Sequence, residues 1–231
     1  MTDFSLNESD FAALRALDTP TVCNALEITS PERRAIGFTV TPLVYARPQL
    51  PPIVGYARTA TLRSMQPAAP GAADRIAYYD YVAGGPGPTI AVIEDIDGLH
   101  GFGAFWGEVN TNIHKAIGCL GVVTNGSIRD LPDWADGFQL LAGNIGPSHG
   151  HVHIVDFGKP VTVNAMAVQS GDLIHADQHG AVVVPHDVAR DIPAAAAKII
   201  EREAIILAAC KAPGSGIASV KAALAKAAEY H

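Results

Sequence analysis

The sequence predicts one α/β domain that combines several short strands with helices at both ends of the chain. Three observations predict it: a strand, loop, helix and strand follow one another in the middle of the chain, short β-type segments follow from residue 138, and 231 residues suit one large domain. We expect N-terminal helices in residues 1–35, an α/β core in 36–186 and C-terminal helices in 187–231.

The N-terminal region predicts two helices. Apolar residues recur at helical spacing in the first, at Phe11, Leu14 and Leu17, and Asp18 or Thr19 is a plausible cap for a second helix over Thr21–Ile28. Four prolines between residues 42 and 52 then interrupt regular structure.

The middle of the chain carries the clearest pattern. After a strand at Ile53–Leu62 and a helix at Ala72–Val82, the sequence predicts a strand at Thr89–Ile96, a helix at Glu108–Gly118 and a strand at Leu120–Thr124. We expect that helix to bury the face carrying Val109, Ile113, Ala116 and Ile117. A strand, helix and strand in this order predict a crossover between parallel strands.

The last third predicts further short strands and then two helices. The strands are expected at Phe138–Leu141, His151–Phe157, Val161–Val163, Asp172–Ala176 and Ala181–Val184. An alanine-rich helix over about Asp187–Lys211 should close the core, and a short final helix follows Pro213–Gly216.

Composition excludes several classes of function. The net charge of −7 and the absence of a Lys/Arg-rich stretch argue against nucleic acid as a ligand. No window approaches 18 continuous apolar residues, so we expect no membrane span. The three scattered cysteines and the polar start of the chain predict reduced thiols in a cytoplasmic protein.

Two segments predict an anion-binding site. Gly107–Asn110 begins the central helix, and Gly126–Asp130 follows the next strand, so both should lie at the carboxyl edge of a parallel sheet. The unpaired first-turn amides and the helix dipole favour a small carboxylate there. Arg129 can add a planar, bidentate contact to the same anion.

The acids beside these groups predict a metal site. Asp130 and Glu108 supply oxygen ligands of the kind that Mg²⁺ or Mn²⁺ prefers, which would make the pocket electrophilic enough for a 2-oxo acid. The plainer alternative is that Arg129 and Asp130 form an ordinary pair after a turn, and that Gly107 and Glu108 only cap a helix.

The stretch WGEVNTNIHKAIGCLGVVTNGSIRD resembles the signature of the RraA-like family, which includes 4-hydroxy-4-methyl-2-oxoglutarate / 4-carboxy-4-hydroxy-2-oxoadipate aldolases. TVCNALE (Thr21–Glu27) and SGDLIHADQHGAVVVP (Ser170–Pro185) resemble two further family segments, so most of the chain is covered. Asn24 and Asn125 depart from the family pattern, which usually has Asp at both positions.

The resemblance implies a swivelling β/β/α fold and a role for each site residue. Arg129 would bind the substrate carboxylate, and Asp130 would ligate Mg²⁺ directly. Glu108 would hold metal-bound water, while the amides of Val109 and Asn110 would take the pyruvyl carboxylate.

The resemblance also implies an oligomer, a homotrimer or a hexamer, with active sites between subunits. A late glutamate of the neighbouring subunit approaches the metal in the aldolases. Glu203 is the best match here, and Glu201 is close enough to compete for that alignment.

Other residues admit alternative roles. His149, His151 and His153 alternate, so on a strand they share one face, where they could bind a transition metal, line a substrate pocket or form a subunit contact. We expect His175 and His179 to be exposed turn residues beside Asp177, and Trp106 to be a core aromatic or a wall of the site.

The lysines leave open a rival mechanism, a Schiff base with the 2-oxo acid, which needs a desolvated lysine. Lys115 and Lys159 are expected on a helix and in a turn, and the other lysines on the C-terminal helices, so none is predicted to be buried.

These patterns predict a metal-dependent (class II) pyruvate aldolase that cleaves 4-hydroxy-2-oxo acids, with oxaloacetate decarboxylase side activity. The alternative, also implied by the resemblance, is a non-catalytic protein-binding regulator of ribonuclease E, which the charge of −7 would suit. A methyltransferase would need a glycine-rich first loop that the sequence lacks.

Overall fold

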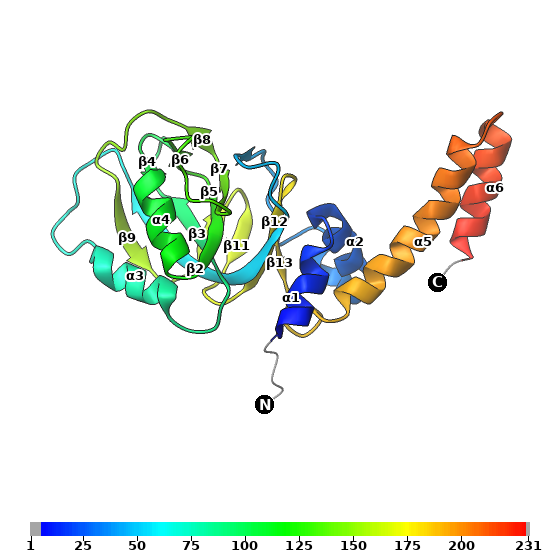
Figure 1. Ribbon diagram of the computed structural model, residues 1–231, viewed down its shortest axis with the longest axis horizontal. Coiled ribbons are helices and arrows are strands. Elements are labelled where there is room, and N and C mark those ends of the chain that lie inside the picture. Colours follow the sequence, from blue (N-terminus) through cyan, green and yellow to red (C-terminus); the bar gives the residue numbers. More distant parts are fainter. Residues whose placement is uncertain (1–5, 230–231) are drawn as a thin grey trace.

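The computed structural model describes residues 6–229, so residues 1–5 and 230–231 of the expected terminal segments lie outside the described residues. A twisted sheet forms the body of the molecule, and two helices project from it as an arm (Figure 1). No helix among the described residues is long and apolar enough to cross a lipid bilayer.

The sheet is built around one long strand, β2 (Ile53–Arg63), whose residues are almost all buried. On one side β2 pairs in parallel with β3 (Thr89–Asp95), and the order continues through β5 (Cys119–Thr124) and β7 (Gln139–Ala142) to the short β1 (Val44–Tyr45). This parallel arrangement confirms the predicted crossover, because β3 and β5 are neighbours joined through a helix.

The other edge of β2 is shared by two antiparallel partners. Its first residues pair with β12 (Leu173–Asp177), which forms a hairpin with β13 (Gly180–Val184), and its last residues pair with β9 (His153–Phe157). The sheet therefore curls into a nearly closed barrel. A hairpin of β10 (Val161–Val163) and β11 (Met166–Val168) packs its apolar residues against one face of this sheet.

Two helices, α3 (Arg75–Ala83) and α4 (Glu108–Ala116), cover the other face of the sheet (Figure 1). The prediction for the buried face of α4 was wrong: Val109 is 69% exposed, whereas Thr111 and His114 are fully buried. Polar side chains can occupy this face because Tyr78 Oη lies 2.9 Å from His114 Nε2, and Thr111 Oγ1 accepts a hydrogen bond from the amide of Ala135.

The N-terminal helices α1 (Glu8–Arg15) and α2 (Thr19–Thr29) pack against β2, β12 and β13 together with the start of α5 (Ile192–Lys211). A 3-10 turn over Pro31–Arg33 follows α2. Asn7 caps α1, and Asp18, one of the two predicted caps, caps α2.

The C-terminal helix prediction needs one correction. Helix α5 begins at Ile192 and not near Asp187, and only its first two turns are buried, at Ile192, Ala195, Ala196 and Ile199. Beyond Ile199, α5 leaves the body and pairs with α6 (Ile217–Ala228), so it closes the core with its start alone (Figure 1).

Candidate functional site

Two short strands that the sequence pattern does not predict bring the two predicted site segments together. β4 (Ala104–Trp106) and β6 (Ser127–Ile128) pair in parallel, and the last residue of one lies opposite the last residue of the other. The amide of Arg129 donates a hydrogen bond of 2.8 Å to the carbonyl of Trp106. Gly107 and Arg129, which follow these strands, therefore lie side by side.

A third short strand, β8 (Asn144–Ile145), pairs with β6 and completes this small sheet. The side chain of Asn125 ties it to the main sheet, because its Oδ1 accepts the amide of Asp95 at 2.7 Å and its Nδ2 donates to the carbonyl of Asp95 at 3.0 Å. The Asn125 side chain thus both accepts and donates a hydrogen bond, which explains why asparagine suits this position.

Gly107 is the N-cap of α4 and offers no side chain to the helix. A Cβ atom at this position would lie only 2.4 Å from Oδ2 of Asp130, so the Asp130 carboxylate can take this position only beside a glycine. The amide of Glu108 points at the same carboxylate, 3.3 Å from Oδ2 of Asp130. The positive end of α4 therefore faces Asp130.

Asp130 and Arg129 form a second contact in the same place. Nε of Arg129 lies 3.5 Å from Oδ2 of Asp130, and the two side chains are 35% and 37% exposed. Asp130 has a backbone φ of 55°, a left-handed conformation that is uncommon outside glycine. Such backbone strain is often found at functional sites.

The other predicted members of the site occupy separate positions. The amides of Val109 and Asn110 lie in the first turn of α4, where helical hydrogen bonding leaves them without partners. The Asn110 side chain holds the helix in place by donating to the carbonyl of Phe105 and accepting from the hydroxyl of Tyr79. The Glu108 side chain is exposed.

A hollow of about 470 Å³ lies beside this corner. Arg129, Val109 and Asn110 contribute to its lining, whereas Glu108 and Asp130 do not. The remaining lining residues come from the segment that leads into α3 and its first residue, from the segment that leads into β9 and its first residue, and from β4: Pro67, Ala68, Arg75, Ala104, Phe105, His149, Gly150, His151, Val152 and His153. The site is therefore a charged corner that opens into a hollow of substrate size.

The three alternating histidines belong to this hollow, which was one of the roles considered for them. The described residues contain no group of three or more His, Cys, Asp or Glu side chains placed to hold a metal ion, and this includes the histidines. Arg75, which also lines the hollow, was missed because an arginine in the first turn of a helix carries no signal of its own in the sequence.

Glu203 does not lie near Glu108 and Asp130 within one subunit. It is an exposed residue in the second half of α5, on the side of the molecule opposite α4 (Figure 1). A glutamate on this arm can reach a site such as this one only on another subunit.

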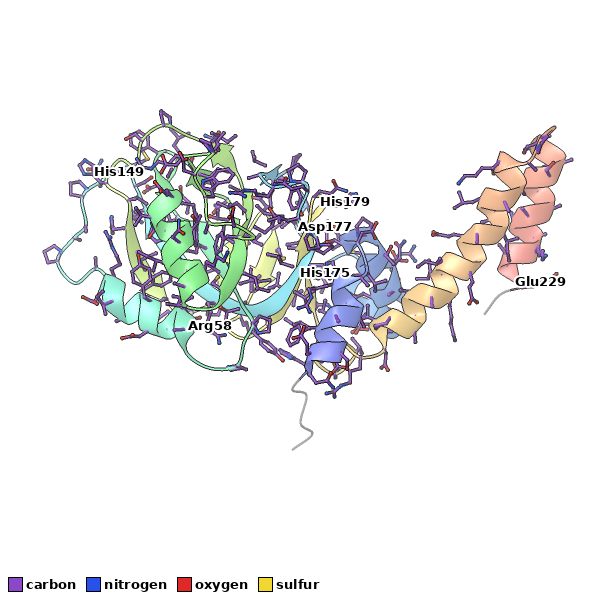
Figure 2. All side chains as sticks on the ribbon, viewed as in Figure 1. Arg58, His149, His175, Asp177, His179 and Glu229 are labelled. Atoms are coloured by element: carbon purple, nitrogen blue, oxygen red, sulfur yellow. The ribbon has the colours of Figure 1, made fainter. Side chains whose placement is uncertain are left out.

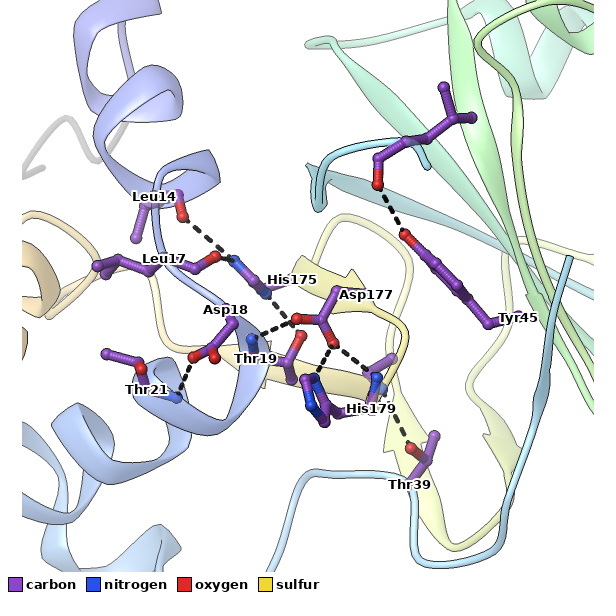
Figure 3. Close-up of polar contacts among 12 residues, drawn as sticks. Leu14, Leu17, Asp18, Thr19, Thr21, Thr39, Tyr45, His175, Asp177 and His179 are labelled. Atoms are coloured by element: carbon purple, nitrogen blue, oxygen red, sulfur yellow. Dashed lines mark hydrogen bonds and ion pairs between the residues drawn. The ribbon is translucent and has the colours of Figure 1, made fainter. Parts of the chain in front are cut away.

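The expectation for His175 was wrong. His175 is fully buried between β12 and the N-terminal helices, where its Nε2 donates to the carbonyls of Leu14 and Leu17 and its Nδ1 lies 3.0 Å from the hydroxyl of Thr19 (Figure 3). Burial lowers the pKa of His175, which favours the neutral ring.

Asp177 extends this buried network. It accepts hydrogen bonds from the amide of Thr19 and from the amide and the ring of His179, and the His179 side chain is exposed as predicted. Figure 2 shows His175, Asp177 and His179 where the body meets the helices, far from His149 at the hollow. These residues fasten α1 and α2 to the sheet and do not belong to the site.

Two further expectations are confirmed. Trp106 is fully buried and packs on Phe105, His114 and Phe138 as a core aromatic. Every lysine of the chain is exposed, and Lys115 and Lys159 contact the carbonyl of Asp136 and the carboxylate of Asp156, respectively.

Comparison with solved structures supports the fold. A protein from Pseudomonas syringae pv. tomato strain DC3000 is 21% identical and superposes with a TM-score of 0.71, over 100% of this chain and 98% of its own. RraAS2 of Streptomyces coelicolor, described as an unusual member of the RNase ES inhibitor RraA protein family, is 24% identical, with a TM-score of 0.67 over 86% of this chain and 95% of its own.

Comparison with known sequences finds a distant relative that matches part of the chain and a family model that matches most of it. Protein DlpA of Legionella pneumophila is 24% identical over 95 residues, which are 38% of this chain and only 15% of that protein. The family model RraA-like, described as Aldolase/RraA, matches residues 14–183, which include the β4–β6 corner and most of the body. The chain belongs to the RraA-like (Aldolase/RraA) family.

Proposed function

We propose that this protein is a divalent-metal-dependent lyase that cleaves 4-hydroxy-2-oxo acids to pyruvate, with oxaloacetate decarboxylation as a side activity. One observation carries the proposal: the β4–β6 pairing places the uncapped start of α4, the Arg129 guanidinium and the Asp130 carboxylate around one point beside a hollow of about 470 Å³. Membership of a family that includes aldolases supports it.

The donor atoms at this corner suit Mg²⁺ or Mn²⁺. Asp130 and Glu108 offer carboxylate oxygens, and both side chains are accessible to solvent. Asp130 would hold the ion, with Glu108 beside it. The ion would supply Lewis-acid stabilisation of the negative charge that develops on the 2-oxo oxygen.

The residues of the chain bind and orient the substrate. Arg129 and the free amides of Val109 and Asn110 hold the carboxylate next to the 2-oxo group, because a guanidinium and a helix N-terminus both favour an anion. This fixes the C3–C4 bond relative to Asp130 and Glu108.

Cleavage of the C3–C4 bond requires two proton transfers. The 4-hydroxyl loses its proton as C4 becomes a carbonyl, and the electron pair of the broken bond passes to C3 and the enolate. Glu108, exposed at the edge of the corner, holds the proton, and C3 takes up a proton to give pyruvate. The rival Schiff-base route lacks a candidate, since every lysine is exposed.

We also propose that the active form is a homotrimer or hexamer. The arm of α5 and α6 exposes apolar side chains that the body does not cover: Ile200, Leu207, Ile217 and Leu224 are each at least half exposed. Burying them against another copy would remove apolar surface from water and would bring Glu203 to a neighbouring subunit.

The proposal is tested by measuring pyruvate release from 4-hydroxy-2-oxo acids with and without a chelator. We expect the activity to vanish with chelator and to return with Mg²⁺ or Mn²⁺. Asp130→Ala should lower kcat/KM by about 10²-fold or more, and Arg129→Lys should mainly raise KM, by about tenfold. Asp133→Ala, which changes an exposed acid nearby, is the control. Activity that persists without metal would contradict the mechanism. Covalent trapping of the substrate on the enzyme by borohydride, which reduces a Schiff base, would contradict it as well.

The second candidate function is regulation of ribonuclease E through protein binding. The net charge of −7 and the fold shared with RraAS2 favour it. A pull-down with the ribonuclease, run beside the pyruvate assay, separates the two functions. If the protein binds the ribonuclease tightly and releases pyruvate from no 2-oxo acid, regulation of the ribonuclease becomes the supported function and the lyase proposal is overturned.

A further inference from the structure

The segment that joins β2 to α3 forms part of the wall of the hollow, and few contacts attach it to the body. Residues 66–71 are exposed, and Ala72 is half-buried. Within the described part of the chain, residues 66–72 make one hydrogen bond, from the amide of Ala72 to the carbonyl of Ala69, and both groups belong to the segment itself. Figure 1 shows this loop standing out from the body at the end opposite the arm. Backbone with so few contacts can move at a low cost in free energy.

Space lies on both sides of this segment. Pro67 and Ala68 line the hollow of about 470 Å³ at the candidate site. Residues 69–72 line a second hollow of about 440 Å³, whose other lining residues include Arg63 of β2 and Val155 of β9. The segment can therefore shift without displacing packed side chains of the core, which is where a shift would be costly.

The first end of the segment is fixed by a buried carboxylate. Oδ2 of Asp97 accepts hydrogen bonds from the amides of Ser64 at 2.6 Å and Met65 at 2.9 Å. Ser64 is also tied to the wall of the hollow, because its Oγ accepts the amide of Gly103 and its carbonyl accepts the amide of His151. The chain is held in place up to Met65, so the first hinge lies directly after this residue.

The other end is fixed at the start of α3. Oδ1 of Asp74 accepts the amide of Ala77 at 2.9 Å and caps the helix, and Ala73 packs against the core. Between the two fixed ends, Pro67 and Pro70 restrict the backbone, because a proline ring fixes φ. A stiff segment between two hinges can move as a unit.

The composition of the segment suits closure over a bound anion. Residues 66–72 carry no ionisable side chain, so closure would add no charge to the hollow and would bring small apolar groups and one amide side chain to it. Excluding water would strengthen the attraction between Arg129 and a bound carboxylate, because the effective dielectric constant around the pair falls.

We propose that residues 66–72 form a lid that closes over the hollow when a 2-oxo acid binds to Arg129 and the start of α4. Asp97 fixes the first hinge, and Asp74 fixes the second. Closure removes water from the bound anion and stabilises the complex. This inference rests on the proposed function for the identity of the ligand, and it adds a conformational step to binding.

A fluorescent reporter on the segment tests for closure. Ala69→Cys is combined with Cys210→Ser, which removes an exposed native thiol, and is labelled with a dye whose emission depends on the polarity of its surroundings. We expect saturating pyruvate or oxalate, each with Mg²⁺, to shift the emission maximum. Ala77→Cys, at an exposed position of α3, is the matched control and should not respond. An unshifted maximum of the Ala69 label, at a ligand concentration that calorimetry shows to be saturating, overturns the lid.

Loosening the segment tests whether closure contributes to affinity. Ala69→Gly combined with Pro70→Gly raises the conformational freedom that closure must remove, and neither residue lines the hollow at the candidate site. We expect the dissociation constant for pyruvate, measured by calorimetry with Mg²⁺, to rise about fivefold or more. An unchanged constant overturns the lid.

The chain offers a matched control for this variant, because the same Ala-Pro-Gly sequence recurs in the link between α5 and α6. Ala212→Gly combined with Pro213→Gly makes the identical change at exposed positions and should leave the dissociation constant within about twofold of the wild type. Thermal unfolding verifies that each variant is folded.

The outcomes separate this proposal from the proposed function. If neither pyruvate nor oxalate binds in the presence of Mg²⁺, the proposed function fails and the lid fails with it. If both ligands bind but the label and the loosened variant show no response, only the lid is overturned. If the lid closes on both ligands but no 4-hydroxy-2-oxo acid releases pyruvate, only the lyase proposal is overturned.

Discussion

The absence of one side chain, that of Gly107, permits the contact on which the candidate site depends. Because a Cβ at this position would lie 2.4 Å from Oδ2 of Asp130, Gly107→Ala must displace the Asp130 carboxylate or the start of α4, and either shift separates the two groups. The backbone φ of −155° is open to alanine, so the fold should survive. We expect kcat/KM for pyruvate release to fall at least tenfold while the unfolding midpoint changes little. Gly98→Ala, where a Cβ meets nothing within 4 Å, is the control.

Asn125 offers a second prediction at the scale of one residue. Asn125→Asp removes the donor to the carbonyl of Asp95 and adds a negative charge next to Asp95, a buried carboxyl group whose pKa burial already raises. We expect a loss of about 1–3 kcal/mol in the free energy of unfolding, measured by urea denaturation at pH 7. Asn112→Asp, at an exposed position of α4, should cost much less. Equal stability of the two variants would show that the Asn125 bridge contributes nothing.

Helix α4 shows at the scale of an element how a buried polar face makes stability depend on pH. His114 is fully buried among Trp106, Tyr78 and Phe138, and this burial lowers its pKa to about 4. Its Nδ1 donates to the carbonyl of Asn110 and its Nε2 accepts from the hydroxyl of Tyr78, so both ring nitrogens are satisfied in the neutral form.

The sign of the effect follows from the lowered pKa. Above pH 6.5 the ring is neutral in the folded and unfolded states, and as the pH falls toward 4 only the unfolded state takes up the proton. His114 should therefore cost about 2 kcal/mol of stability between pH 7 and pH 5. His114→Gln, which cannot titrate, should lose less stability over the same interval in urea denaturation. Parallel pH profiles for the two proteins would contradict this assignment.

The same elements show what could be predicted from the sequence. The strands β3 and β5 and the helix between them were predicted because long apolar runs and a helical period mark them directly. β4 and β6 were missed because strands of three and two residues are too short to show a period, although their pairing assembles the site. The buried face of α4 was mispredicted because hydrogen bonds allow Thr111 and His114 to be buried, and periodicity does not register such bonds.

At the scale of the whole molecule, the arm of α5 and α6 exposes apolar side chains that the body of one subunit does not cover. The alanine-rich sequence of α5 predicted that this helix closes the core, but only its first two turns are buried against the body. If the arm packs on another copy, the wild type should sediment as a trimer or hexamer, and Leu207→Glu combined with Leu224→Glu should reduce its mass to that of the monomer. Ile76→Glu, at an exposed residue of α3, should leave the mass unchanged.

Subunit complementation tests whether the arm also supplies Glu203 to a neighbouring site. Asp130→Ala and Glu203→Ala should each be inactive alone, because each leaves every shared site with one defect. When the two variants are unfolded, mixed in equal amounts and refolded together, random assembly should place an intact Asp130 opposite an intact Glu203 in roughly a quarter of the sites, and pyruvate release should return to that extent. Full activity of Glu203→Ala alone would show that Glu203 lies outside the site. If both variants are inactive and their mixed oligomers stay inactive, the two residues do not act together across an interface.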